Sequence, residues 1–138
     1  MPLTRLVYCS QARSGISRTD LAAIGATANS FNASMGITGC LLLCEGRFLQ
    51  VLEGSATQVN DLYHRIIADR RHQSLFLNEV VRIPERTFAA WAMKWMHAAD
   101  AIAIRDILLR YQVRSGFMPE QLTGEAATRL LRDVSAVL

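Results

Sequence analysis

The sequence predicts an α+β sandwich, in which helices pack against both faces of a β-sheet. Three observations support this class: apolar strand-like runs alternate with helical patterns, serine caps mark two helix starts, and the final third of the chain is amphipathic. In chain order the first two thirds read strand, helix, strand, strand, helix, strand. This order predicts a ferredoxin-like βαββαβ sandwich with an extra strand, and with two C-terminal helices that cover the other sheet face.

The first strand and the first helix follow from composition and capping. Residues 3–9 have strand composition, and residues 10–15 read as a polar loop. Ser17 then has the position of a helix N-cap, with Asp20 in the first turn to meet the helix dipole. Apolar residues at helical spacing follow, and Gly36 is expected to end this helix.

A strand hairpin and a second helix come next. The apolar run 37–44 predicts a strand, and a tight turn joins it to a further strand over residues 46–54. Ser55 and Gln58 have the form of a capping box, in which each side chain satisfies one backbone donor of the helix. We expect the hairpin to lie at the centre of the sheet, covered on both faces.

The remaining elements complete the predicted layers. Residues 77–83 read as a strand that Pro84 stops, and the tryptophan-rich residues 88–96 are expected to form a fifth strand. Residues 101–110 and 119–137 have amphipathic helical patterns. These two helices are expected to cover the sheet face that the first two helices leave open.

The composition indicates one domain with a helical appendage. The chain has 138 residues, 51% of them hydrophobic, which suffices for one core but hardly for two. We divide it into residues 1–97, which hold the βαββαβ domain, and residues 98–138, a helical cap. The net charge of +3 comes from arginines spread along the chain, which favours a solvated surface over a nucleic-acid footprint.

The cysteines and the termini indicate the compartment. Cys9, Cys40 and Cys44 lie in apolar runs without a CxxC pair or a histidine at metal-ligand spacing, so they read as buried thiols and predict no metal site. The N-terminus lacks the layout of a secretory signal, and no uncharged apolar stretch reaches the ~18 residues of a membrane helix. We therefore expect a cytoplasmic protein with no membrane partner.

Gln50 is an amide in the middle of an apolar strand. It shares a strand face with Phe48 and Leu52, and an unpaired amide in such a place costs roughly 1–3 kcal/mol. Tyr8 falls on one face of the first strand together with Leu6. Because the first and third strands are neighbours in a ferredoxin-like sheet, we expect the Tyr8 phenol and the Gln50 amide to meet beneath the two helices.

The second helix carries a polar fringe beside an apolar patch. Leu62, Arg65, Ile66 and Asp69 follow i, i+3, i+4, i+7 spacing, which places them on one side of a helix. A flat, mostly apolar ligand with one polar edge and a charged tail would fit between the helices.

Separated motifs of the chain resemble the BLUF family of flavin-binding blue-light sensors. The similarity covers roughly residues 2–97, in order and without an evident insertion. The matching segments are residues 6–10, Asn32 with residues 36–39, residues 48–54, residues 63–66 with Asp69, Arg71 and His72, and Phe88 with residues 91–93.

The resemblance implies a flavin between the two helices, with FAD expected and FMN or riboflavin as alternatives. Asn32 would bond the polar edge of the ring, Gln50 would stand near its reactive nitrogen and carbonyl, and Tyr8 would hold Gln50. Arg65 would approach the ribityl or phosphate portion. The implied cofactor-binding residues are Ile24, Asn32, Phe48, Gln50, Arg65, Ile66, Asp69 and His72.

The family's behaviour also implies the mechanism. Tyr8 would donate an electron and a proton to the excited flavin, and after rapid recombination the change that persists is a rotated or tautomerised Gln50. Trp91 and Met93 compete in the family for a position near the glutamine and would relay the signal. Ala92 stands where many members carry serine, and Phe31 where a polar residue is common, so hydrogen bonds associated with those positions are expected to be missing.

The resemblance implies a photoreceptor without catalytic residues, which signals to a separate effector protein in a light-dependent complex and forms a homo-oligomer. Three alternatives compete with it, and one of them is a module that binds a ligand without photoactivity. A small enzyme would need a nucleophile, a base and an oxyanion site, which the motifs do not assemble. An RNA-binding sheet would need paired stacking aromatics, which are absent from the Arg47 strand. Taken singly, Tyr8 also reads as a core phenol, and Arg65 with Asp69 as a solvated pair.

Overall fold

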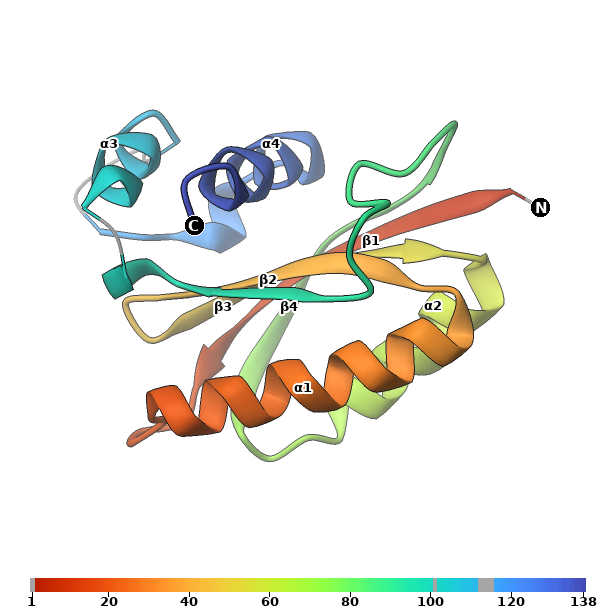
Figure 1. The fold of residues 1–138 in the computed structure, drawn as a ribbon, viewed down its shortest axis with the longest axis horizontal. Helices are drawn as coiled ribbons and strands as arrows, with labels where there is room; N and C mark the ends of the chain where they lie inside the picture. The colour runs from red at the N-terminus through yellow and green to blue at the C-terminus, as the bar shows by residue number, and fades with distance from the viewer. Residues whose placement is uncertain (1, 101, 112–115) are drawn as a thin grey trace.

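The chain folds into three layers, with a five-stranded sheet between two pairs of helices (Figure 1). The computed structural model describes residues 2–100, 102–111 and 116–138. Its helices and strands are β1 (Leu3–Ala12), α1 (Arg18–Met35), β2 (Thr38–Cys44), β3 (Arg47–Gly54), α2 (Ala56–Ile67), β4 (His72–Ile83), β5 (Lys94–His97), α3 (Ala103–Leu109) and α4 (Gly124–Ser135).

The sheet has the strand order β4-β1-β3-β2-β5, which places the first and third strands side by side. β5 runs parallel to β2, and the other neighbouring strands are antiparallel. Helices α1 and α2 cover one face of the sheet, and α3 and α4 cover the other (Figure 1). The predicted ferredoxin-like βαββαβ core, the extra strand and the second helical layer are therefore confirmed.

The outer strand pair is longer than predicted. Residues 10–12 continue β1 instead of forming a loop, and β4 begins at His72 rather than at residue 77. Gln11 pairs with Gln73 and Ala12 with His72, so the polar start of β4 is held by backbone pairing to β1. Backbone hydrogen bonds between strands form whatever the side chains are, so the polar residues at this end of β1 and β4 gave no apolar pattern from which the extra strand length could be predicted.

The predicted strand over residues 88–96 is wrong in its first part, because only Lys94–His97 form β5. The buried carboxylate of Glu53 accepts hydrogen bonds from the backbone N–H groups of Thr87 and Phe88, at 2.7 and 2.9 Å. A neighbouring strand would otherwise have satisfied these donors. The carboxylate thus ties the segment that precedes β5 to the end of β3.

The cap predicted for α1 is confirmed, and the one predicted for α2 is confirmed in part. Ser17 and Asp20 form a complete capping box, and Gly36 ends α1 in the left-handed conformation, with φ of 66°. At α2, the Ser55 hydroxyl accepts from the Gln58 N–H and donates to the Gln58 side chain, so the reciprocal half of the predicted box is missing.

The C-terminal helices are shorter than predicted. The pattern over 119–137 divides into a 3-10 turn, Pro119–Gln121, and α4, which begins at Gly124 after the Thr123 cap. The pattern over 101–110 becomes α3, Ala103–Leu109, while residue 101 lies outside the described residues.

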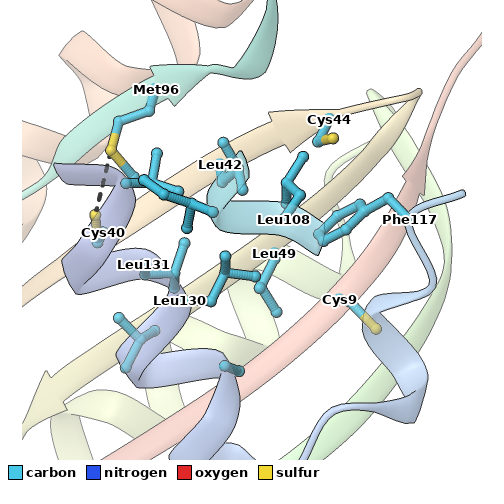
Figure 2. Packing of buried hydrophobic residues seen from close by; sticks show 14 of the residues in the cluster. Cys9, Cys40, Leu42, Cys44, Leu49, Met96, Leu108, Phe117, Leu130 and Leu131 are labelled. Atoms are coloured by element: carbon cyan, nitrogen blue, oxygen red, sulfur yellow. Dashed lines mark hydrogen bonds between the residues drawn. The ribbon is translucent and has the colours of Figure 1, made fainter. Parts of the chain in front are cut away.

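Each face of the sheet has its own apolar core. On one face, residues of β1, β2 and β3 pack against α3 and α4, and Figure 2 shows Leu42 and Leu49 facing Leu130 and Leu131. On the other face, α1 and α2 pack over a second cluster that includes Tyr8. The hairpin of β2 and β3 is buried on both faces, as the sequence predicts.

The three cysteines are buried and unpaired in the first of these cores (Figure 2). Burial raises the pKa of Cys40 and of Cys44 to about 12, and that of Cys9 to about 11. They are therefore un-ionised packing residues at neutral pH. Among the described residues, no helix combines the length and the hydropathy that crossing a membrane requires.

Candidate functional site

A pocket of about 230 Å³ lies where α1 and α2 meet the sheet. All eight residues that the sequence predicts for cofactor binding line it: Ile24, Asn32, Phe48, Gln50, Arg65, Ile66, Asp69 and His72. Leu62, which the sequence places on the same helix side as Arg65 and Ile66, also lines the pocket, and the lining residues that the sequence did not assign to the site are Thr27, Ala28, Phe31, Leu41 and Arg71. The i, i+3, i+4, i+7 spacing from Ile24 could have identified the α1 wall, whereas Arg71 has no comparable local signal.

Tyr8 and Gln50 face each other at the floor of the pocket. They are direct partners in the pairing of β1 with β3, and their exposed fractions are 3% and 4%. The Tyr8 hydroxyl donates a hydrogen bond to Oε1 of Gln50. The predicted meeting of the phenol and the amide is therefore confirmed, and it satisfies two polar groups that would be costly to bury alone.

The other end of the Gln50 amide faces Met93. Its Nε2 lies 3.5 Å from the Met93 sulfur, which is a weak acceptor. Met93 belongs to the core on the α1 and α2 face, whereas Trp91 packs against the core on the α3 and α4 face. Of the two relay residues that the resemblance implies, Met93 is thus the one beside the glutamine.

Asn32 presents an acceptor that has no partner within the described chain. The residue is fully buried in α1, and its Nδ2 donates to the carbonyl of Ala92 at 3.0 Å. Its Oδ1 is buried and accepts no hydrogen bond. An unsatisfied buried acceptor costs roughly 1–3 kcal/mol, so this atom on the pocket wall points to a ligand that carries an N–H donor.

Charged side chains surround the pocket on the α2 side. The Arg65 guanidinium stacks over the Phe31 ring, 4.1 Å from its centroid, and Asp69 forms an ion pair with Arg71 at 2.5 Å. The alternative of a simple Arg65–Asp69 pair is therefore wrong. Hydrogen bonds from the Arg71 side chain lower the pKa of Asp69, so this carboxylate is ionised at neutral pH.

His72 forms part of the pocket wall with both ring nitrogens bonded. Its Nε2 lies 2.7 Å from the Ile66 carbonyl, which can only accept, so Nε2 carries a proton. Its Nδ1 lies 2.8 Å from the hydroxyl of Ser10, a residue of β1. The imidazole therefore joins the end of α2 to the sheet and holds this side of the pocket in place.

Burial raises the pKa of Tyr8 far above its usual value near 10, and the nearby Tyr63 and Asp69 act in the same direction. We expect the folded protein to keep the Tyr8 proton at pH ~11, whereas the unfolded chain releases it above pH ~10. The stability that Tyr8 contributes is therefore fully present below pH ~10 and is lost as the pH rises further.

An absorbance titration of the phenolate band tests this expectation. The folded parent and the Tyr8→Phe variant should titrate the same number of tyrosines up to pH ~11, because Tyr8 does not ionise. One additional tyrosine titrating in the parent would contradict the assignment. Unfolding at pH ~8 and pH ~11 should show the advantage of the parent over Tyr8→Phe shrinking at the higher pH.

A ferredoxin-like sheet with a buried phenol–amide pair beneath two helices, and with an unpaired acceptor on the wall above, defines a ligand-binding domain. Comparison with known families identifies which class of ligand-binding domain this is. A profile of the BLUF family, described as sensors of blue-light using FAD, matches residues 3–94. The chain belongs to the BLUF family, and the resemblance that the sequence motifs indicate is confirmed.

The curated relatives are parts of much larger proteins. Photoactivated adenylate cyclase subunit beta of Euglena longa is 42% identical over 92 residues, which cover 66% of this chain and 11% of the cyclase subunit. The subunit beta of Euglena gracilis is likewise 42% identical over 92 residues. This chain thus spans about a tenth of the length of these relatives.

Two groups of solved structures match the chain over nearly its whole length. The photo-activated state of BlsA has a TM-score of 0.83 and 28% identity, and covers 95% of this chain and 93% of its own. The dark state of BlrB, a BLUF protein, has a TM-score of 0.78 and 27% identity over 96% of this chain and 97% of its own. These matches extend beyond the family profile into the C-terminal helices.

Proposed function

We propose that this BLUF domain binds FAD non-covalently in the pocket and signals blue light through Tyr8 and Gln50. Gln50 carries the proposal, because it lies at the pocket floor with Tyr8 at one end of its amide and Met93 at the other. The family uses flavin to sense blue light. The pocket beside the hydrogen-bonded phenol and amide supports the proposal.

The residues of the pocket fit a flavin. The free Oδ1 of Asn32 would accept from the N–H on the polar edge of the ring, which supplies its missing partner. Ile24 and Ile66 would cover the ring faces, and Arg65 and Arg71 stand where a phosphorylated tail would leave the pocket. When bound, the flavin supplies a strongly oxidising excited state under blue light.

Tyr8 and Gln50 supply the switch. Tyr8 is held as a neutral phenol whose proton already points at Gln50, so it is poised to lose an electron and a proton together. An amide has one donor end and one acceptor end, and turning it exchanges the partners of both. The turned amide would place Oε1 toward the Met93 sulfur, which has no proton to donate, and the contact with Met93 would change.

FAD is the proposed cofactor because the family description names it. A structure of Klebsiella pneumoniae BlrP1, 28% identical to this chain, is described with FMN, so FMN stays an alternative, as does riboflavin. We expect the purified protein to show flavin absorption bands and a small, reversible red shift under blue light. Chromatography of the extracted pigment identifies the flavin. A colourless protein that does not take up flavin would exclude the proposal.

We also propose how the light signal leaves the domain. The protein forms a homo-oligomer that binds a separate effector protein in a light-dependent manner, and α3 and α4 form the surface for this contact. The support is that these helices cover the sheet face opposite the pocket and that Trp91 packs beneath them. No catalytic residue is proposed in this domain, and a cytoplasmic location stays a prediction. Identical oligomerisation and identical partner binding in dark and lit protein would rule this output out.

A further inference from the structure

Lys94, the first residue of β5, is the only lysine in the chain. Its ammonium lies 4.5 Å from the centroid of the Trp91 ring. The same group donates to the backbone oxygens of Ser135, at 2.9 Å, and of Leu138, at 3.0 Å. The three N–H donors of an ammonium thus have two oxygens and one aromatic face as partners.

The Ser135 oxygen is the last carbonyl of α4, and Leu138 follows the helix by three residues. The last carbonyls of a helix have no partner within the helix, and a cation placed there also complements the helix dipole. Ser135 is the final residue of α4, and α4 lies on the sheet face opposite the pocket (Figure 1). Lys94 therefore stabilises the last turn of α4 from a position in the sheet.

Lys94 follows directly after Met93 in the chain. Met93 faces Gln50 on the pocket side of the sheet, whereas Lys94, which begins β5, reaches α4 on the opposite side. A backbone shift that Met93 undergoes is passed to Lys94 without any intervening residue. The contacts from Tyr8 to α4 thus form one continuous series through Gln50, Met93 and Lys94.

We propose that Lys94 is the positioning residue that couples the state of Gln50 to the C-terminal turn of α4. This inference rests on the proposed photoreceptor function and specifies its output. In the dark state the ammonium holds the end of α4 against Trp91. When the Gln50 amide turns, the displacement of Met93 draws Lys94 away from the Ser135 and Leu138 oxygens, and the last turn of α4 loosens.

Hydrogen exchange of the α4 amides, in darkness and under blue light, tests the coupling. The parent should exchange several-fold faster at the end of α4 when lit. Lys94→Met keeps a linear side chain without charge or donors, and it should exchange fast in both states while keeping its red shift. Lys94→Arg, which keeps a cation and donors, should restore the difference between dark and light. An unchanged difference in Lys94→Met would overturn the inference.

The single lysine permits a second measurement on the unmodified parent. An amine-acylating reagent labels lysine side chains and the N-terminal amine, and mass spectrometry separates these two sites. Labelling at Lys94 should be several-fold faster in light, and equal rates in a parent that shows its red shift would also overturn the inference. A parent without a red shift would instead contradict the proposed function, so the two failures are distinguishable.

Discussion

Replacing Gln50 with leucine should abolish the light-driven red shift. Leucine has a side chain of similar size but offers no donor or acceptor, so the Tyr8 hydroxyl loses its acceptor and the switch loses its two orientations. We expect the residual shift to be less than about a tenth of that of the parent. Difference spectra between dark and illuminated protein measure it. The flavin should stay bound, because Asn32 and the apolar walls are untouched.

Two variants control this experiment. Tyr8→Phe should also lose the shift, because it removes the phenol that pairs with the amide. Leu41 lies opposite Gln50 on β2 and lines the same pocket without a polar group, so Leu41→Met should keep the shift. A normal shift in Gln50→Leu, or its loss in Leu41→Met alone, would refute the role assigned to the amide.

Replacing Glu53 with alanine should destabilise the protein by about 3–5 kcal/mol, because three hydrogen-bond donors lose their acceptor in a buried site. The Glu53 carboxylate is fully buried and accepts from the Thr38 hydroxyl at 3.0 Å and from the N–H groups of Thr87 and Phe88. Its removal leaves three donors without their acceptor and leaves a cavity. Because a domain of this size is stable by roughly 5–15 kcal/mol, the loss is a large part of the total.

Urea unfolding measures the effect through the shift of the midpoint. Glu53→Gln should lose less, because its amide keeps one acceptor oxygen for the backbone donors. Glu85 is an exposed carboxylate close in the chain to Thr87 and Phe88, and Glu85→Ala should change the free energy of unfolding by no more than about 0.5 kcal/mol. Equal effects of Glu53→Ala and Glu85→Ala would show that the network around Glu53 does not stabilise the fold.

The network around Glu53 also explains a difference between sequence and structure. Trp91 and Met93 are two residues apart, so in a regular strand both would face the same side of the sheet. Because Thr87 and Phe88 are bound to Glu53 at the end of β3 and the strand begins only at Lys94, this parity does not hold, and the two side chains reach opposite cores. The sequence could name both relay residues but could not decide which of them faces Gln50.

The polar contacts of the pocket also could be predicted from the sequence only in part. Strand parity and strand order predicted that Tyr8 meets Gln50, since both rules hold for any sheet of this topology. The sequence also placed Arg65 and Asp69 on one helix face, which favoured a pair between them. The actual partner of Asp69 is Arg71, because the chain turns back toward β4 just after α2.

The sequence by itself determined the layers of the fold, the meeting of Tyr8 with Gln50 and the eight residues around the pocket. These features follow from local periodicity, from strand order and from motifs shared with the BLUF family. The three-dimensional packing was needed to show that Met93 rather than Trp91 adjoins Gln50, that the Asn32 acceptor has no partner among the described residues, and that Lys94 binds the end of α4. Each of these depends on contacts between residues far apart in the chain, which no local pattern records.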